Sequence, residues 1–338
     1  MKIMRLQSVS LVWPLALVTL ALSPASEPRF TPIDGASIER TLEMKGTREL
    51  KSLVMKFGDQ SEEVPDAKIH VDLGWKYVVV DEFKKCKADH IDALTRTFES
   101  LEKKRSELST DAKGAEKKRA VEEECDLEGK SVDFKWNAER KEYDVKFAGE
   151  EAGDKELLTG LELDMDYRGF LPEAGAEVGA KWNVDFADLK GALMRPGGDL
   201  PFHLEQPPRP MDLRMRDAVW DANQGTVALE LGAVTEADGA QLQKILFKGT
   251  NTVSASVDAE ADEPGPTKLA LEDELTIEGT LVWDVKAGRA HSLEWSSKGG
   301  MVLTVYLPAK GPDGEKATIE QVFTFDTEYD YTGTFKSR

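Results

Sequence analysis

The sequence predicts a mainly β protein, with one or more large antiparallel curved sheets or a half-open barrel. In the second half of the chain, apolar residues occupy every second position of long runs, and polar residues lie between them. This period of two indicates antiparallel strands with one buried face and one face in water. The runs are longer than the usual strand of about five or six residues. We therefore expect long strands in a strongly twisted sheet.

The expected strands are spread over most of the chain. In the C-terminal part, apolar residues alternate over residues 269–283, 293–307 and 319–331. Turns that contain glycine, at residues 286–289 and 312–314, separate these runs. The N-terminal part has shorter alternating runs, at residues 38–57, 69–79, 132–136 and 143–147.

One stretch departs from this pattern. Its apolar residues recur at steps of three, four and seven: Ile91, Leu94, Phe98, Leu101 and Leu108. Such steps are typical of an amphipathic helix. We therefore expect one helical insertion over about residues 88–124, with its interleaved charges on a solvated face.

The first 25 residues are typical of a secretory signal peptide. Lys2 and Arg5 precede an apolar run that ends at Leu22, and the small residues Ser23 and Ala25 follow. The run is shorter than the roughly 20 residues that cross a bilayer, and its flanks fit cleavage after Ala25. We expect an exported protein, periplasmic or extracellular after cleavage near Ala25, without a transmembrane segment in the mature chain.

A proline-rich stretch divides the rest of the chain. Residues 196–212 hold Pro196, Pro201, Pro207, Pro208 and Pro210, a third of the 15 prolines. Proline fixes φ and removes a backbone donor, so we expect a connector there. The signal peptide at 1–25 would then be followed by an N-terminal β-rich half at 26–195, which carries the helical insertion. A C-terminal antiparallel β half would occupy residues 213–338.

The composition limits the classes of partner. The 338 residues carry a net charge of -19, and 40% of them are hydrophobic. An acidic surface repels phosphate backbones, so we expect no nucleic-acid partner. The apolar fraction is too high for a disordered chain.

The two cysteines, Cys86 and Cys125, lie at either end of the expected helical insertion. An exported protein is exposed to oxidising conditions, in which two cysteines can pair. We therefore predict that Cys86 and Cys125 lie close enough to form a disulfide, with Cα atoms within about 7 Å of each other; an unpaired thiol is the alternative.

No sequence motif indicates catalysis, a metal or a cofactor. The four histidines are far apart, and the chain has neither a G-x-S-x-G elbow nor a glycine-rich phosphate loop. Asp164 and Asp166 place two carboxylates on one face of an extended segment. A calcium site needs more oxygen ligands than this pair supplies, so we expect a solvated strand face. We predict no catalytic, cofactor-binding or metal-binding residue and no cofactor.

Short motifs spread over most of the mature chain carry a resemblance. They are residues 80–83, 94–98, 127–130, 171–172, 178–182, 196–199, 279–284 and 288–289. Together they resemble uncharacterised exported bacterial proteins of the planctomycete type. The segment from Trp283 and Asp284 to Gly288 and Arg289 is also similar to hairpins of curved-sheet envelope proteins of the lipoprotein-carrier type. That second resemblance implies a half-open barrel that holds an acyl chain.

These observations predict an exported, non-catalytic envelope or periplasmic protein. It would bind a hydrophobic small molecule or an envelope protein, or it would be structural. The alternative is a secreted hydrolase that uses paired carboxylates, which need not be close in sequence. A carrier would have an apolar groove on the concave sheet face, whereas a hydrolase would have inward-pointing carboxylates with raised pKa values.

Overall fold

The structure is a computed structural model that describes residues 27–87, 90–110, 115–149, 153–203, 207–261, 263–311 and 314–338. The predicted signal peptide at residues 1–25 lies outside the described residues. The elements in chain order are β1 (Ser37–Phe57), β2 (Gln60–Glu63), β3 (Lys68–Cys86), β4 (Ile91–Thr110), β5 (Glu116–Glu123), β6 (Ser131–Asn137), β7 (Glu142–Phe147), the 3-10 helices η1 (Lys155–Leu158) and η2 (Arg168–Phe170), β8 (Lys181–Asp185), α1 (Phe186–Met194), α2 (Pro210–Asp221), β9 (Gln224–Ala237), β10 (Ala240–Asp258), β11 (Lys268–Asp284), β12 (Arg289–Lys310) and β13 (Lys316–Ser337).

The strands form one antiparallel sheet, which confirms the predicted fold class. Their order is β7-β6-β4-β3-β1-β13-β12-β11-β10-β9-β8, with β2 beside β1 and β5 beside β4. The first and last long strands pair along almost their whole length, from Ile38 opposite Ser337 to Phe57 opposite Ile319. The predicted N-terminal and C-terminal halves therefore share one sheet. Among the described residues, no ladder joins the edge strands β7 and β8, so the sheet is open.

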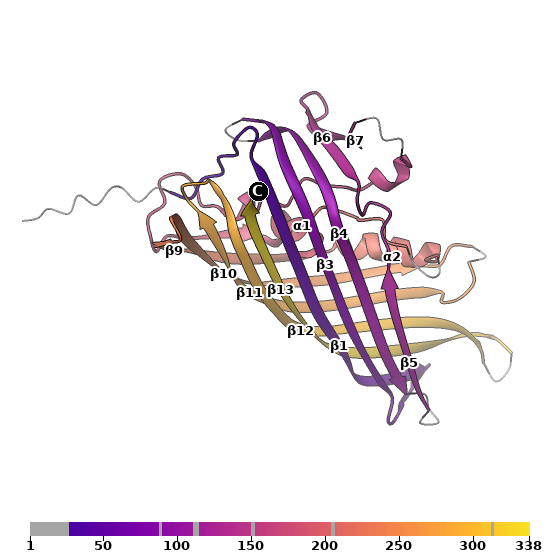
Figure 1. The fold of residues 1–338 in the computed structure, drawn as a ribbon. Coiled ribbons are helices and arrows are strands. Elements are labelled where there is room, and N and C mark those ends of the chain that lie inside the picture. The colour runs from indigo at the N-terminus through magenta and orange to yellow at the C-terminus, as the bar shows by residue number, and fades with distance from the viewer. Residues whose placement is uncertain are drawn as a thin grey trace, which may run out of the picture.

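The sheet folds over on itself around a segment of the same chain. In Figure 1, β1, β3 and β4 cross in front of β9 to β12. Residues from about 157 to 202 pack between these two parts and share a single hydrophobic core with both. Phe170, for example, packs against Phe247 of β10, while Tyr167 packs against Phe335 of β13. We call the face that holds this segment the inner face.

Glycines on the inner face allow the strands to bend sharply. A side chain on Gly279 would collide with the carbonyl oxygen of Glu294 and with the ring of Phe247. A side chain on Gly299 would collide with the carbonyl oxygen of Glu274 on the neighbouring strand. Glycine within a strand often marks such a close approach of backbones. The absence of a side chain at these positions allows the long strands to bend so that the sheet folds over on itself.

The predicted helical insertion at 88–124 is wrong, because its described residues form β4 and β5. Ile91, Leu94, Phe98 and Leu101 are all buried, and all belong to one strand. The register against β3 shifts between Val78 and Val79 and again near Cys86. Each such bulge adds one residue, which turns a strand step of two into a step of three. The bulged strand thus has the spacing of a helix, while the two real helices, α1 and α2, lie elsewhere.

Candidate functional site

A buried ionic cluster on the inner face positions a segment that lines an acidic cavity. Asp81 of β3 lies opposite Arg96 of β4 in the strand register. Arg96 donates to both oxygens of Asp81, at 2.7 and 3.0 Å, and Arg40 of β1 donates to Oδ2 at 2.7 Å. All three residues are at most 4% exposed. Burial disfavours the Asp81 carboxylate, but Arg96 and Arg40 outweigh it and hold its pKa below the usual value.

The two arginines also bind the backbone of the covering segment. Arg96 donates to the carbonyl oxygen of Glu162 at 3.1 Å, and Arg40 donates to that of Met165. The hydroxyls of Tyr167 and Tyr331 lie 2.8 Å apart and share a hydrogen bond. Residues 162–167 are not in a helix or strand, so these contacts to the sheet fix their course. Asp164 lies in the middle of this anchored stretch.

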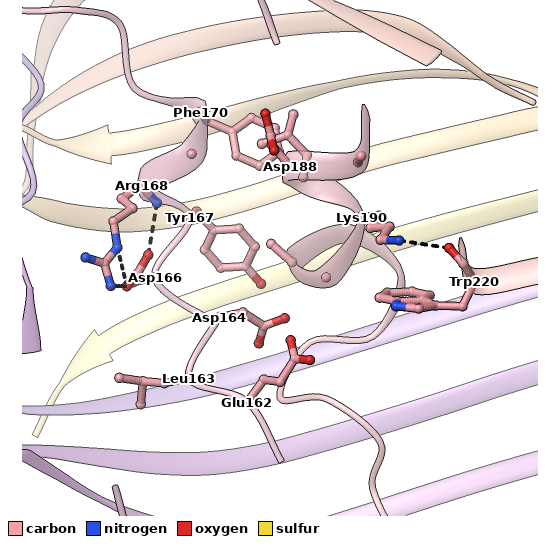
Figure 2. A pocket seen from close by; sticks show the side chains of 15 residues that line it. Glu162, Leu163, Asp164, Asp166, Tyr167, Arg168, Phe170, Asp188, Lys190 and Trp220 are labelled. Carbon is pink, nitrogen blue, oxygen red and sulfur yellow. Dashed lines mark hydrogen bonds and ion pairs between the residues drawn. The ribbon is translucent and has the colours of Figure 1, made fainter. Parts of the chain in front are cut away.

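A cavity of about 420 Å³ lies between this stretch, α1 and Trp220 (Figure 2). Its walls are strongly acidic, with some basic and aromatic side chains. The charged lining residues are Glu162, Asp164, Asp166, Arg168, Asp188 and Lys190. A neighbouring groove of about 210 Å³ shares Glu162 and Trp220 with the cavity and adds Arg195, Asp199, Asp217 and Asp221.

Asp164 is the acid of the cavity that has an enclosed carboxyl oxygen without a partner in the described part of the chain. Its Oδ1 accepts a hydrogen bond of 2.7 Å from the backbone N–H of Gly197, whereas Oδ2 is buried and has no hydrogen-bond partner among the described residues. Burial raises the pKa of Asp164 to about 7. Both Asp164 Oδ2 and Glu162 Oε2 lie within 4 Å of the point at which a side chain on Gly191 would begin. Two carboxyl groups thus meet at the wall formed by α1.

Most of the basic side chains around the cavity already have partners. Arg168 pairs with Asp166 at 2.7 Å, and Arg195 pairs with Asp199 at 2.9 Å. Lys190 donates to the carbonyl oxygen of Trp220 at 2.8 Å. Desolvation and the nearby Asp199 raise the pKa of Glu162. The cavity therefore has an excess of acidic groups, with Glu162 and Asp164 at its centre.

The sequence did not identify this site, although it did single out Asp164 and Asp166. The expected solvated strand face is wrong, because the two residues are not on a strand and the Asp166 side chain is only 8% exposed. Asp166 instead accepts from the backbone N–H and the guanidinium of Arg168. Across the described residues, no three His, Cys, Asp or Glu side chains are grouped so that they could hold a metal ion.

A second feature is the far end of the inner face, where the sheet is apolar and partly uncovered. Leu53, Phe323, Leu303 and Leu271 follow one another across β1, β13, β12 and β11. All four are half-buried. The rows beyond them continue with Met55, Phe57, Val305, Leu307 and Ile319, of which Met55 is 37% exposed and the others are half-buried. The polar Gln321 of β13 lies between Met55 and Val305 in the register. We call the nine apolar residues the open apolar end.

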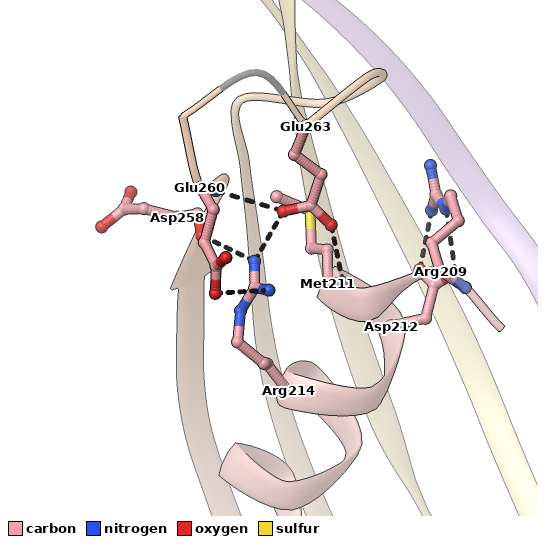
Figure 3. Close-up of polar contacts among 7 residues, drawn as sticks. All are labelled: Arg209, Met211, Asp212, Arg214, Asp258, Glu260 and Glu263. Carbon is pink, nitrogen blue, oxygen red and sulfur yellow. Dashed lines mark hydrogen bonds and ion pairs between the residues drawn. The ribbon is translucent and has the colours of Figure 1, made fainter.

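Helix α2 packs on the inner face and covers part of this end. Met211 and Met215 of α2 form a cluster with Leu269 of β11, and Leu271 and Val305 of the open apolar end pack against that cluster. The helix is fastened at its start by Glu263, which accepts from the backbone N–H of Met211 at 2.8 Å and from Arg214 at 2.7 Å (Figure 3). The helix therefore forms one fixed wall of the open apolar end.

Four polar side chains lie among apolar ones between the open apolar end and the packed aromatic core. Asn251, Asp273, Ser297 and Thr327 are inner residues of β10 to β13, but none is directly opposite another in the strand register, where apolar residues such as Leu275 and Met301 intervene. One buried oxygen of each has no hydrogen-bond partner within the described ranges. Burial raises the pKa of Asp273 to about 6, although Arg48 opposes the shift. We call these four residues the polar belt; buried polar groups of this kind usually bind water or a ligand.

The predicted disulfide is not formed, because Cys86 and Cys125 are both free thiols. Cys86 is the last residue of β3. Cys125 forms a backbone β-bridge with Phe202, and the ring of Phe202 stacks on that of Tyr77 with the ring centroids 5.9 Å apart. Tyr77 precedes Cys86 by nine residues on one strand, a separation of roughly 25–30 Å. Burial raises the pKa of Cys86 to about 11, so the thiol is not activated.

Comparison with known proteins gives no family. No family model matches the chain, and no curated protein matches it. An outer membrane channel from Pseudomonas putida F1 aligns with 91% of this chain and 98% of its own, at 8% identity and a TM-score of 0.22. OccK7 of Pseudomonas aeruginosa aligns with 90% of this chain and 100% of its own, at 8% identity and a TM-score of 0.21. Values this low do not establish a shared fold or function. In the part of the chain that the structure describes, no helix has the length and apolar character to cross a membrane.

Proposed function

We propose that this chain is an exported, non-catalytic envelope protein that binds an amphiphile, a molecule with an apolar chain and a polar head, on its inner face. The open apolar end carries this proposal. Its half-exposed side chains, such as Leu303, Val305 and Phe323, form one continuous surface on adjacent strands. Soluble proteins rarely leave such a surface in water unless it binds something.

The polar belt supports an amphiphile rather than a plain hydrocarbon. It adjoins the open apolar end at Asp273, which lies two residues from Leu271 on the same face of β11 and diagonally from Leu303 of β12. An apolar chain on Leu271 and Leu303 would bring a polar head close to Asp273. The unpaired oxygen of Asp273 would then gain a partner, which relieves the cost of burying it.

The expected signal peptide and the expected resemblance of residues 283–289 to hairpins of the lipoprotein-carrier type agree with this proposal. Both point to the space outside the cytoplasm, where apolar molecules must be shielded from water. The alternative of a hydrolase would depend on Glu162 and Asp164. A general acid must reach the reacting atoms within about 3 Å, yet Asp164 Oδ2 is enclosed. The geometry therefore favours binding over catalysis.

Titration with a fluorescent long-chain fatty acid tests the proposal. We expect saturable binding to the mature protein. Val305→Asp places a charge on the open apolar end and should weaken binding at least about tenfold, because an unpaired carboxylate would lie against the hydrocarbon chain of the fatty acid. Thr304→Asp is the matched control, since Thr304 is the adjacent residue on the outer face of β12 and is equally half-buried.

Two results would contradict the proposal. One is the absence of saturable binding by folded protein. The other is an equal loss of affinity in Val305→Asp and Thr304→Asp, which would place the fatty acid elsewhere. Binding of a purified envelope protein in place of the fatty acid, abolished by Val305→Asp, would replace the amphiphile with a protein partner.

A further inference from the structure

We infer that the cavity between residues 162–170, α1 and Trp220 is a separate binding site for a small organic cation that carries a primary ammonium group. The site is independent of the open apolar end, because none of its lining residues belongs to that surface. Its ligand would be held by Glu162, with Asp164 beside it, since one oxygen of each lies within 4 Å of the same point at Gly191. Carboxylates that bind an ammonium group form short, charge-assisted hydrogen bonds.

The first support is the shape and charge of the cavity. Its volume of about 420 Å³ suits a small molecule. Of the basic groups around it, Arg168 and Arg195 are neutralised by Asp166 and Asp199. Lys190 donates to a carbonyl oxygen of the wall and lies 4.6 Å from the ring of Trp220. The remaining carboxylates attract a cation from solution, and the net charge of -19 adds to that attraction.

The second support is the unpaired oxygen of Asp164, which a cluster of surface acids would not have. Asp164 Oδ2 is buried and without a partner in the described structure, and it points toward the wall formed by Gly191. A buried polar group without a partner costs free energy. Asp164 can remain without a partner if it holds a proton, and it can release that proton when a cation arrives beside it.

The charged groups around Asp164 set the direction of this response. Glu162 on the same segment favours the protonated form of Asp164, whereas Arg96 of β4 and the N–H of Gly197 favour the ionised form. On α1, Lys190 and Asp188 line the same cavity and have opposite charges. An added cation next to Glu162 would shift the balance toward ionised Asp164, because opposite charges stabilise each other.

Isothermal titration calorimetry with putrescine tests the inference, with 1,4-butanediol as an uncharged molecule of similar length. We expect saturable binding of putrescine and none of butanediol. At about pH 6, the heat should change with the ionisation enthalpy of the buffer, because Asp164 loses its proton on binding. At about pH 8.5, where Asp164 is already ionised, this buffer dependence should vanish.

Variants separate the site from a general effect of charge. Asp164→Asn should weaken putrescine at least about tenfold and abolish proton release at about pH 6. Gly191→Ala favours the helix but places a Cβ 2.8 Å from Asp164 Oδ2, so it should weaken binding without unfolding the protein. Glu177→Gln removes one exposed charge outside the cavity and should leave binding unchanged.

The inference fails if folded wild-type protein does not bind putrescine saturably. It also fails if Asp164→Asn and Gly191→Ala both bind putrescine as wild type does. Circular dichroism of each variant shows whether it is folded. Neither failure would affect the fatty-acid test, because Val305 and Thr304 lie on the far part of β12 and not in the cavity.

Discussion

Asp81 is the residue on which the contacts beneath the cavity converge. It is fully buried, and its single carboxylate pairs with both Arg40 and Arg96, which in turn hold the covering segment. Asp81→Asn keeps the shape but leaves two buried guanidinium groups without a carboxylate. We expect a loss of about 3–5 kcal/mol in the free energy of unfolding, measured by urea denaturation.

An exposed ion pair provides the control for Asp81. Glu278 pairs with Lys248 at 3.2 Å, and both side chains are more than half exposed. Glu278→Gln should cost less than about 1 kcal/mol, because solvent screens the pair. Equal losses in Asp81→Asn and Glu278→Gln would show that the buried cluster does not anchor the fold.

Asp164 should make the protein less stable as the pH rises, whereas an ordinary salt-bridged acid makes a protein more stable as the pH rises. Its native pKa of about 7 lies above the usual 3.8. Native protein therefore binds the proton more tightly than unfolded chain does, and stability falls as the pH rises from about 4 to 7. The loss could reach about 4 kcal/mol. Asp164→Asn should be less sensitive to pH over this range, and relative to wild type it should gain stability at higher pH.

Denaturation midpoints of wild type and Asp164→Asn, measured at several pH values, check this sign. The comparison with the variant is needed because burial also raises the pKa of Asp273, which contributes in the same direction. A wild type that becomes more stable relative to Asp164→Asn as the pH rises would contradict a buried, protonated Asp164.

Sequence reasoning could not identify the acidic cavity from its residues. Asp164 receives its hydrogen bond from Gly197, and its neighbour Arg96 comes from β4, so both are distant in sequence. Arg96 was also hidden within a segment that the spacing assigned to a helix. Chemistry that depends on such long-range contacts leaves no local pattern.

At the scale of elements, β4 allows a direct test of whether residues 91–110 form a strand or the predicted helix. Leu101 and Leu108 share the predicted helical stripe, but Leu101 is 3% exposed and Leu108 is 40% exposed. Leu101→Ala should therefore cost about 2–5 kcal/mol, whereas Leu108→Ala should cost less than about 0.5 kcal/mol. Thermal or chemical denaturation measures both. Similar large losses at the two positions would support the helix instead.

Helix α2 should depend on the contacts made by Glu263. This side chain accepts hydrogen bonds from the N–H groups of Met211 and Glu260 and from Arg214. Glu263→Ala removes all three hydrogen bonds, so the amide protons of α2 should exchange faster, while those of β11 and β12 keep their protection. Hydrogen–deuterium exchange followed by mass spectrometry measures this. Unchanged exchange in α2 would show that Met211 and Met215 alone hold it.

The long C-terminal strands were predictable because apolar residues occupy most of their inner positions and keep the period of two across the few polar or glycine positions. β11 and β12 follow the period of two from Leu269 to Trp283 and from Leu293 to Leu307. β4 was not predictable, because its bulges change the spacing. The helices α1 and α2 were missed because they are short, and α2 begins at Pro210 within the stretch expected to be a connector.

At the scale of the whole molecule, the pairing of β1 with β13 decides the architecture. It brings the two predicted halves into one sheet and places their inner faces around one core. Alternation within each strand predicts which residues are buried but not which strands are neighbours. The sequence also did not predict that residues 157–202 cover the inner face of the sheet, because that segment has no clear periodicity.

The central claim is that the open apolar end of this single sheet binds an amphiphile. The most direct measurement is a titration of isotope-labelled protein with a long-chain fatty acid, followed by the chemical shifts of backbone amides. The account predicts saturable shifts grouped at residues 53–57, 269–271, 303–307 and 319–323, with weaker shifts at the polar belt. Shifts confined to the outer face, shifts scattered over the sheet, or no shifts at saturating fatty acid would contradict it.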